Sequence, residues 1–223
     1  MKKVLTRGSV ELIAVVLGIT LSLWVDDKRE LNIIDKNNIK TLQSIKNEVR
    51  LRIDYIERKI NQYKRDIEVG EYVIKNWTNI DFDSITSKTK NDRSIVLTLK
   101  AYRAINLPVS IYNSLNSDGS IAKLDQNSIK VILNDLYEVI PAHIVDGVEN
   151  ERVLYHSFNE FIINNYPRIV DDGVGELEKN DYKRFFNDDI VLGYVLEKTH
   201  IRKFILRLIT NYHNRLINLE VML

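Results

Sequence analysis

The chain has 223 residues, of which 44% are hydrophobic and 28% are charged, and its 32 basic residues nearly balance its 31 acidic ones. Phosphate binding needs a concentrated basic face, so this balance argues against nucleic acid as a partner. The chain has no cysteine, which excludes disulfides, thiolate metal sites and a thiol nucleophile. Only 3 prolines and 8 glycines occur, which favours long helices over sheets.

The first element is an apolar segment from Val10 to Val25, VELIAVVLGITLSLWV. A helix rises about 1.5 Å per residue, so a run of about 17 residues can just cross a hydrocarbon core about 30 Å thick. We therefore predict an N-terminal transmembrane helix, with residues 1–26 forming a cytoplasmic stub and the anchor. A cleaved signal peptide is the alternative, although only Thr20 and Ser22 offer small side chains near the end of the run.

The charges beside this segment predict its orientation. The residues that precede it include Lys2, Lys3 and Arg7, whereas after it Asp26, Asp27 and Glu30 offset Lys28 and Arg29. Basic flanks stay on the cytoplasmic side, so we expect the N-terminus inside and residues 27–223 outside. This pattern predicts a single-pass protein of a bacterial inner (cytoplasmic) membrane whose domain is periplasmic.

One face of the anchor carries Glu11, Ala14, Gly18 and Ser22, which recur every third or fourth residue. Small residues at this spacing let two helices approach closely in lipid, so we predict a contact face for another membrane helix. Two interpretations of Glu11 stay open. It faces a partner helix or an ion path, or it stays near the headgroups and pairs with Arg7.

The chain from Lys28 to Trp77 contains no proline and a single glycine, which predicts one long helix leaving the membrane. Apolar residues recur at every seventh position in two offset series, which we call ladders. The first is Leu42, Val49, Ile56, Tyr63, Gly70 and Trp77, and the second is Ile39, Lys46, Ile53, Ile60, Ile67 and Ile74. Apart from the interruptions at Lys46 and Gly70, this spacing is typical of a bundle helix or coiled coil and predicts a packing stripe.

The charged residues between the ladders are expected on a solvated face of this helix. They include Glu48, Arg50, Arg52, Glu57, Arg58 and Lys64. Residues 78–93 are polar and rich in turn formers, which predicts a connector.

The remaining chain predicts further helices. They cover Ser94–Ile105, about Ser110–Leu115, about Asn127–Ile140, about Pro141 or Asp146 to Tyr166 (burying Val153, Leu154, Phe158, Phe161 and Ile162), and about Asp181–Met222, with a turn at Asp118–Gly119 and a loop at 168–180. The last helix is long enough to lie antiparallel along the first. The predicted fold is all-α: one N-terminal transmembrane helix followed by an elongated helical bundle with two long antiparallel helices.

Two stretches, Glu11–Glu30 and Ile111–Glu138, resemble a family of uncharacterised single-pass, membrane-anchored helical proteins common in Bacteroidota. The first stretch is similar to the family's anchor, and the second to its aromatic–Leu–Ser-x-Gly turn followed by a helix ending in Tyr. The family usually has Gln, Asn and Trp at the membrane exit, where this chain has Trp24, Asp26 and Asp27. The resemblance implies a membrane-anchored helical protein and no catalytic residues.

No motif predicts catalysis, a cofactor or a metal. Glu197-x-x-His200 has the spacing of di-iron bundle proteins, but no second Glu-x-x-His occurs. Asp171, Asp172 and Glu176 lack the alternating ligands of a calcium loop.

We therefore predict a non-enzymatic protein, a self-associating sensor or scaffold that binds a partner or ligand through its bundle. Its expected partners are the lipid bilayer and a second copy or another membrane protein. The alternative is a subunit of a pore or ion-driven membrane complex that uses Glu11 as its intramembrane polar element.

Overall fold

The computed structural model describes residues 2–81, 95–171 and 179–223, and the side chains of residues 16–81, 95–170 and 181–223. Within these residues every regular element is a helix, so the predicted all-α class is confirmed. The predicted connector lies outside the described residues from 82 onward, as does most of the predicted 168–180 loop.

The elements follow one another in a simple order. They are α1 (Lys2–Lys75), α3 (Ile95–Lys100), α4 (Ser110–Ser117), α5 (Asn127–Asn134), the π-helix η1 (Asp135–Val139), α6 (Ile140–Asn165), the 3-10 helix η2 (Pro167–Asp171), α7 (Lys179–Phe185) and α8 (Asp189–Met222).

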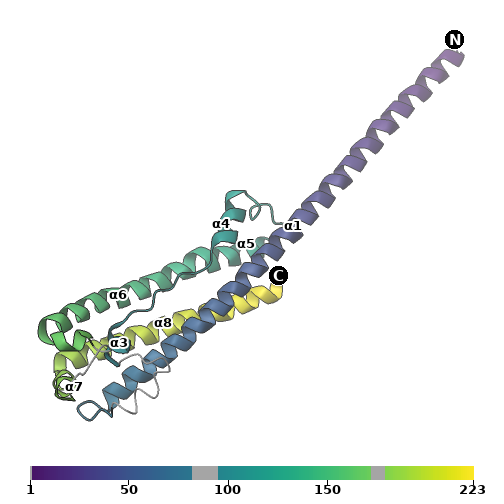
Figure 1. Ribbon diagram of the computed structural model, residues 1–223. Coiled ribbons are helices and arrows are strands. Elements are labelled where there is room, and N and C mark those ends of the chain that lie inside the picture. The colour runs from purple at the N-terminus through teal and green to yellow at the C-terminus, as the bar shows by residue number, and fades with distance from the viewer. Residues whose placement is uncertain (1, 82–94, 172–178) are drawn as a thin grey trace.

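Helix α1 is a single helix of 74 residues, and its N-terminal half projects as a rod well outside the bundle (Figure 1). From Val16, where the described side chains of α1 begin, every residue up to Lys40 except Asn38 is exposed, and Thr41 is the first that is buried. Asn38 Nδ2 donates to Asp125 Oδ2 at 3.1 Å, which links the end of the rod to the chain before α5. The predicted unbroken long helix is confirmed.

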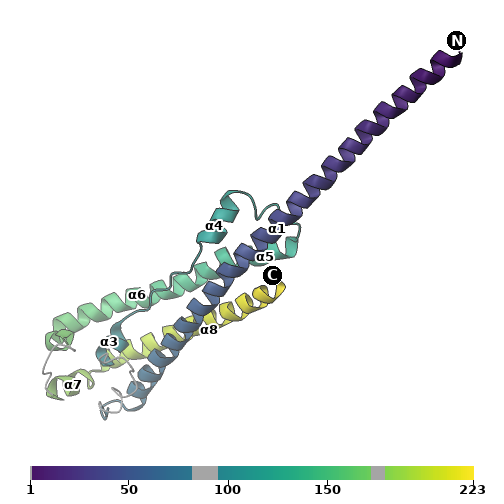
Figure 2. The same cartoon turned by 45° about the vertical axis from the view of Figure 1, so that its right-hand side comes forward.

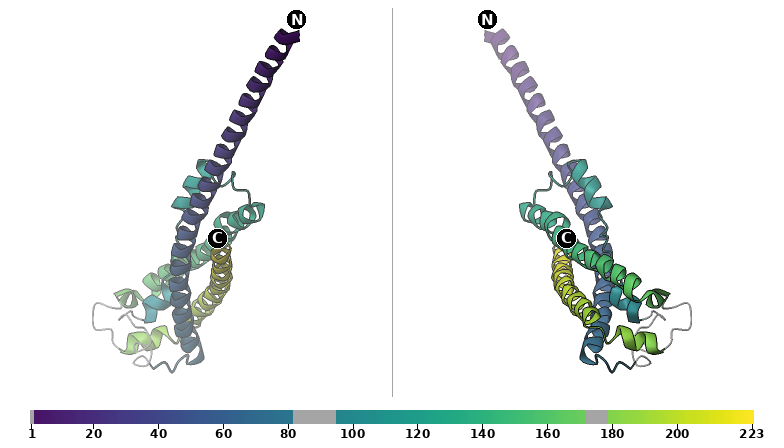
Figure 3. Two further views of the ribbon diagram at one scale, coloured as in Figure 1. Left: turned by 90° about the vertical axis from the view of Figure 1, so that its right-hand side faces the viewer. Right: turned by 90° about the vertical axis from the view of Figure 1, so that its left-hand side faces the viewer.

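Helices α1 and α8 run antiparallel and form the spine of the bundle. Arg50 near the start of the packed part of α1 pairs with Glu220 near the end of α8, with 2.7 Å between Nε and Oε1. Glu71 near the end of α1 pairs with Lys203, earlier in α8, at 2.7 Å. The third long helix, α6, packs along α8, and the three stay side by side when the molecule is turned (Figures 2 and 3).

Two apolar clusters fill the bundle. The cluster nearer the rod includes Ile45, Val49, Ile56, Leu133, Ile205 and Leu216. The cluster at the far end is rich in aromatic residues and includes Val73, Leu99, Phe158, Phe185 and Val195. In this second cluster the rings of Phe158 and Tyr194 stack with centroids 4.6 Å apart.

The predicted helix Ser94–Ile105 is too long, because α3 ends at Lys100 and residues 101–109 form no helix. The predicted helix Asp181–Met222 is likewise divided into α7 and α8. The break falls at Asp188, whose Oδ1 accepts the Ile190 N–H at 2.8 Å and so caps the start of α8.

Pro141 does not open a new segment, contrary to the prediction. Helix α5, the π-turn and α6 follow without interruption, and Pro141 lies in the first turn of α6. The Ile140 N–H donates to Asp135 O, five residues back. In this i→i−5 pattern the N–H of residue 141 would donate to the Leu136 carbonyl. Proline has no N–H, so the Leu136 carbonyl is left without a bond inside the helix.

Some burial predictions are wrong. Glu48 and Arg52, expected on a solvated face, are 1% and 0% exposed. Val153, expected in the core of α6, is 57% exposed, whereas Phe158 and Ile162 on the same helix are buried as predicted.

Candidate functional site

The non-helical segment 101–109 crosses the bundle beside α1, α6 and α8, and side chains from these helices bind its backbone. Backbone carbonyl oxygens of the segment accept hydrogen bonds from four side chains: Ala101 O from Arg202 (2.6 Å), Arg103 O from Tyr63 (3.3 Å), Ala104 O from Lys59 (2.6 Å) and Pro108 O from Arg52 (2.5 Å). Two backbone N–H groups donate to side chains: Arg103 N to Glu151 (3.3 Å) and Asn106 N to Tyr55 (2.8 Å). A buried backbone group must find a hydrogen-bond partner. Here long polar side chains replace the missing helical bonds, which explains why the helix ends at Lys100.

A buried ionic cluster anchors this segment, and we define it as Asp66, Arg103, Glu151, Lys198 and Arg202. Glu151 Oε1 lies 2.8 Å from Arg202 Nε and 3.6 Å from Lys198 Nζ. Arg103 makes two bonds to Asp66, at 2.6 and 2.8 Å. The cluster joins α1, the 101–109 segment, α6 and α8, so it ties every long element of the bundle to the others.

The ionic cluster holds three basic groups and two carboxylates. Burial lowers the pKa of Lys198 to about 8, with nearby Arg202 adding to the effect and Glu151 opposing it. The Lys198 ammonium donates to the carbonyl oxygens of Lys100 and Glu151, at 3.0 and 3.4 Å. A neutral Lys198 amine has two N–H groups, so it could keep both hydrogen bonds after losing its proton. The two remaining positive charges would then balance the two carboxylates.

Tyr63 closes the cluster on the α1 side. Its hydroxyl lies 3.0 Å from Glu151 Oε2, and burial and this carboxylate raise the Tyr63 pKa. A bond to Asp66 raises the pKa of Arg103. Glu151, Lys198 and Arg202 are at most 1% exposed, so a solute cannot reach them in this conformation. The ionic cluster and Tyr63 therefore hold the elements they join in fixed positions, and we call these six residues the latch.

A second buried polar group lies nearer the rod. The Glu48 carboxylate accepts the N–H groups of Ile111 and Tyr112 at 2.6 and 3.1 Å, so it caps the start of α4 from another helix. Arg52 Nη1 donates to the Leu136 carbonyl, the group that the π-turn frees, at 3.0 Å. Tyr212 OH also donates to this carbonyl, at 2.9 Å.

Arg52 also takes part in an aromatic stack. Its guanidinium lies 3.6 Å from the centroid of the Tyr137 ring, and the Tyr112 ring stacks on Tyr137 at 4.1 Å. Two groups this close cannot share one face of a ring, so Tyr137 lies between Arg52 and Tyr112. Cation–π contact with a desolvated guanidinium is worth about 2 kcal/mol, which helps to offset the burial of the charge.

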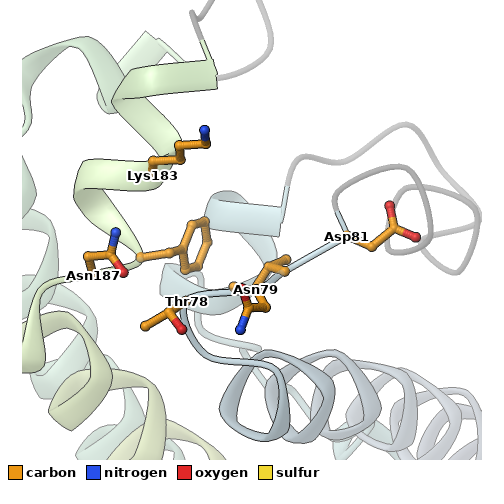
Figure 4. A pocket seen from close by; sticks show the side chains of 7 residues that line it. Thr78, Asn79, Asp81, Lys183 and Asn187 are labelled. Atoms are coloured by element: carbon orange, nitrogen blue, oxygen red, sulfur yellow. The ribbon is translucent and has the colours of Figure 1, made fainter.

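A surface pocket of about 360 Å³ (Figure 4) lies beyond the C-terminal end of α1, at the end of the bundle farthest from the rod (Figure 1). Its lining comes from the chain after α1, from α7 and from the two residues that follow α7, and comprises Thr78, Asn79, Ile80, Asp81, Lys183, Phe186 and Asn187. Asp81 lies apart from the other labelled side chains (Figure 4). Thr78 has a φ of +73°, which is strained for a β-branched residue. The pocket offers amide and hydroxyl groups around one aromatic ring.

Most residues of the predicted packing stripe on α1 are buried or half-buried in the bundle. Val49, Ile56, Ile60, Tyr63 and Ile67 are buried, and Leu42, Ile53 and Ile74 are half-buried against the two clusters. Ile39 of the second ladder is 66% exposed because it lies on the rod.

Gly70 interrupts the stripe for a reason that only the structure shows. A Cβ at this position would lie 2.4 Å from Thr199 Oγ1, so α1 and α8 approach closely there.

The predicted membrane contact face lies on the projecting part of α1. Gly18 has no atom within 4 Å of the Cβ it lacks, and Ser22 is exposed. The side chains of Glu11 and Ala14 lie outside the described residues. Over the part of the chain whose side chains are described, which in α1 begins at Val16, no helix is long and apolar enough to cross a membrane.

The sequence predicted neither the ionic cluster nor the burial of Arg52, although a signal for both exists. Arg52 follows Val49 by three positions and precedes Ile56 by four, so it lies on the apolar stripe. Arg202 likewise precedes Ile205 by three positions on α8. A charge at such a position predicts a buried ion pair or a hydrogen-bonded polar group.

No three His, Asp or Glu side chains in the described part of the chain are placed to hold a metal ion. The comparisons with known proteins give no family either. No protein-family model matches the chain, and no significant match exists among the curated proteins or the solved structures. The resemblance to the membrane-anchored family therefore stays a prediction.

Proposed function

We propose that this chain is a non-enzymatic membrane-anchored protein whose rigid bundle serves as a self-associating scaffold or sensor. The observation that carries the proposal is the apolar start of the rod. Large apolar side chains there are 45–60% exposed and contact no other helix of the described chain: Val16, Leu17, Ile19, Leu21, Leu23, Trp24 and Val25. A helix that is apolar all round needs a non-aqueous surrounding, and a bilayer supplies one.

The rod between this apolar start and the bundle would act as a spacer. Residues 26–40 are helical and nearly all exposed. At about 1.5 Å per residue they would hold the bundle about 22 Å from the end of the apolar run. The charge flanks favour a cytoplasmic N-terminus and a periplasmic bundle in a bacterial inner membrane.

The geometry of α1 also favours self-association through the contact face. Ile45, fully buried in the bundle, lies 27 positions after Gly18. At about 100° per residue the two positions fall on opposite sides of a straight helix. The contact face therefore points away from the bundle, and a second anchor could approach Gly18 without meeting the first bundle.

The latch supports a scaffold more than an enzyme. Its charged groups are buried and bound to backbone, so they fix the positions of α1, α6 and α8. With these helix positions fixed, the bundle would act as one rigid body from the rod to its far end.

Fractionation tests the anchor first. We expect the full-length chain in the membrane fraction, released by detergent and retained in high salt or carbonate. Recovery in the soluble fraction without detergent would reject it. Protease added to intact spheroplasts should digest the bundle if it is periplasmic. Protection from the protease would indicate the opposite orientation, with the bundle in the cytoplasm.

Crosslinking in membranes tests the contact face. Gly18→Leu adds bulk to this face, and we expect it to reduce the yield of crosslinked dimer. Thr20→Leu is the matched control, because Thr20 lies on the opposite side of the helix. Equal dimer yields in the two variants and the wild type would count against self-association through this face.

A further inference from the structure

A groove runs between α1 and α8. Two adjoining cavities of about 510 and 340 Å³ share His200 and Lys203 in their linings. The first is also lined by Ile67, Leu206 and Arg207, and the second by Glu71, Ile74, Lys75, Leu196 and Thr199. The groove therefore extends over the membrane-distal half of the α1–α8 pair.

The floor of the groove is apolar. Leu196 is 47% exposed, Ile74 and Leu206 are half-buried, and Ile67 is buried between the helices. The close approach at Gly70 and Thr199 keeps the two helices together beneath the groove. These apolar side chains offer a strip to which an apolar helix face could bind.

The rim of the groove is basic. Lys75, Lys203, Arg207 and His200 are all exposed. The one acidic lining residue, Glu71, already pairs with Lys203 at 2.7 Å. The groove thus combines an apolar floor with an excess of basic groups, although the chain as a whole is nearly neutral with a net charge of +1.

We propose that this groove binds an acidic amphipathic helix of a partner protein. Residues 196–207 span about 16 Å at 1.5 Å per residue, which matches three turns of a bound helix. A helix laid in a groove places apolar residues at i, i+3/i+4 and i+7 on the floor. Carboxylates beside this stripe would meet Lys75, Lys203 and Arg207.

Two other occupants fit less well. A second copy would present the same basic rim, and like charges facing each other oppose such pairing. The bilayer is too far away, because Lys75 lies 35 positions beyond Lys40, or about 50 Å further along α1. The inference goes beyond the proposed function, and only the exclusion of the bilayer as occupant rests on the proposed anchor.

The test uses the full-length chain in phosphatidylcholine nanodiscs and a fluorescent helical peptide. The peptide carries Leu at i, i+4, i+7 and i+11 with Glu at the flanking positions, and a matched peptide carries Lys in place of Glu. Empty nanodiscs give the background. We expect fluorescence anisotropy to show saturable binding of the Glu peptide, weakened by salt, and at least tenfold weaker binding of the Lys peptide.

Variants locate the binding. Lys203→Glu combined with Arg207→Glu should weaken binding of the Glu peptide at least tenfold, whereas Lys123→Glu, an exposed change outside the groove, should leave it unchanged. Leu196→Asp should also abolish binding. Val153→Asp, at a similarly exposed position on α6, should not. Circular dichroism melting of each variant confirms that it is folded.

Several outcomes would overturn the proposal. They are no binding of the Glu peptide above the nanodisc background, equal binding of a scrambled peptide of the same composition, or equal losses in the groove and control variants. Binding of palmitate with no binding of the peptide would indicate a lipid site. Groove-dependent self-association of the chain would indicate a second copy.

Discussion

Arg202 Nε on α8 lies 2.8 Å from Glu151 Oε1 on α6, and neither side chain is more than 1% exposed. The same guanidinium donates to the carbonyl oxygens of Thr98 and Ala101 at 2.8 and 2.6 Å. One buried arginine therefore links two long helices to the end of α3. Breaking a buried pair by removing one partner costs far more than an exposed pair contributes.

Glu151→Gln should destabilise the bundle strongly. The amide leaves Arg202 and Lys198 without their carboxylate, so we expect a loss of about 3–5 kcal/mol in the free energy of unfolding. Urea unfolding followed by circular dichroism measures it. Glu149→Gln is the matched control, because Glu149 pairs with Arg152 at 2.8 Å on the surface and should cost less than about 1 kcal/mol. Similar losses in the two variants would contradict the latch.

Stability should rise between about pH 8 and pH 10. The Lys198 pKa is about 8 in the folded chain against 10.5 for a free lysine. Over this range Lys198 keeps its proton in the unfolded chain but loses it in the folded chain. Raising the pH from 8 to 10 therefore increases the free energy of unfolding by about 2 kcal/mol.

Above about pH 10 the trend should reverse. Burial raises the pKa values of Tyr63, Tyr137 and Tyr212, so these phenols ionise first in the unfolded chain. Urea unfolding at each pH measures both limbs. Lys198→Met should remove the rise and keep the fall, and an unchanged rise in this variant would reject the role of Lys198.

Gly70→Ala should destabilise the α1–α8 contact, because its Cβ would lie 2.4 Å from Thr199 Oγ1. Overpacking of this kind costs about 1–3 kcal/mol. Thr199→Ala removes the clashing hydroxyl, so the double variant should recover much of the loss in a thermal unfolding cycle. A fully additive cycle would show that the two residues are not in contact.

Thr78→Gly should stabilise the chain. Thr78 has a φ of +73°, and a left-handed conformation costs an L-residue about 1–2 kcal/mol. The greater backbone entropy of unfolded glycine offsets about 0.5–1 kcal/mol of this, so we expect a gain of about 0.5–1 kcal/mol in thermal unfolding.

Gly119→Ala is the opposite case. Gly119 has a φ of +76° and open space around its missing Cβ, so this change should destabilise through backbone strain alone. A loss of stability in Thr78→Gly would show that the threonine side chain makes a contact that outweighs the strain.

The sequence by itself determined the helical class and the long first helix. The proline-free run and the ladder through Val49, Ile56 and Tyr63 are local patterns, and helical periodicity depends only on spacing along the chain. The same spacing placed the buried residues Ile205, Tyr212 and Leu216 on α8. The turn at Gly119 was also local, because positive φ favours glycine.

Only the tertiary structure decided where the charges lie and where the third helix ends. Glu48 and Arg52 looked solvated because a sequence does not show which distant backbone groups need partners. Helical propensity favoured a helix through Ile105, but side chains of Arg202, Glu151 and Lys59 bind the backbone of residues 101–109 instead. Such bonds join residues that are tens of positions apart, and their free energy outweighs the local preference of the segment.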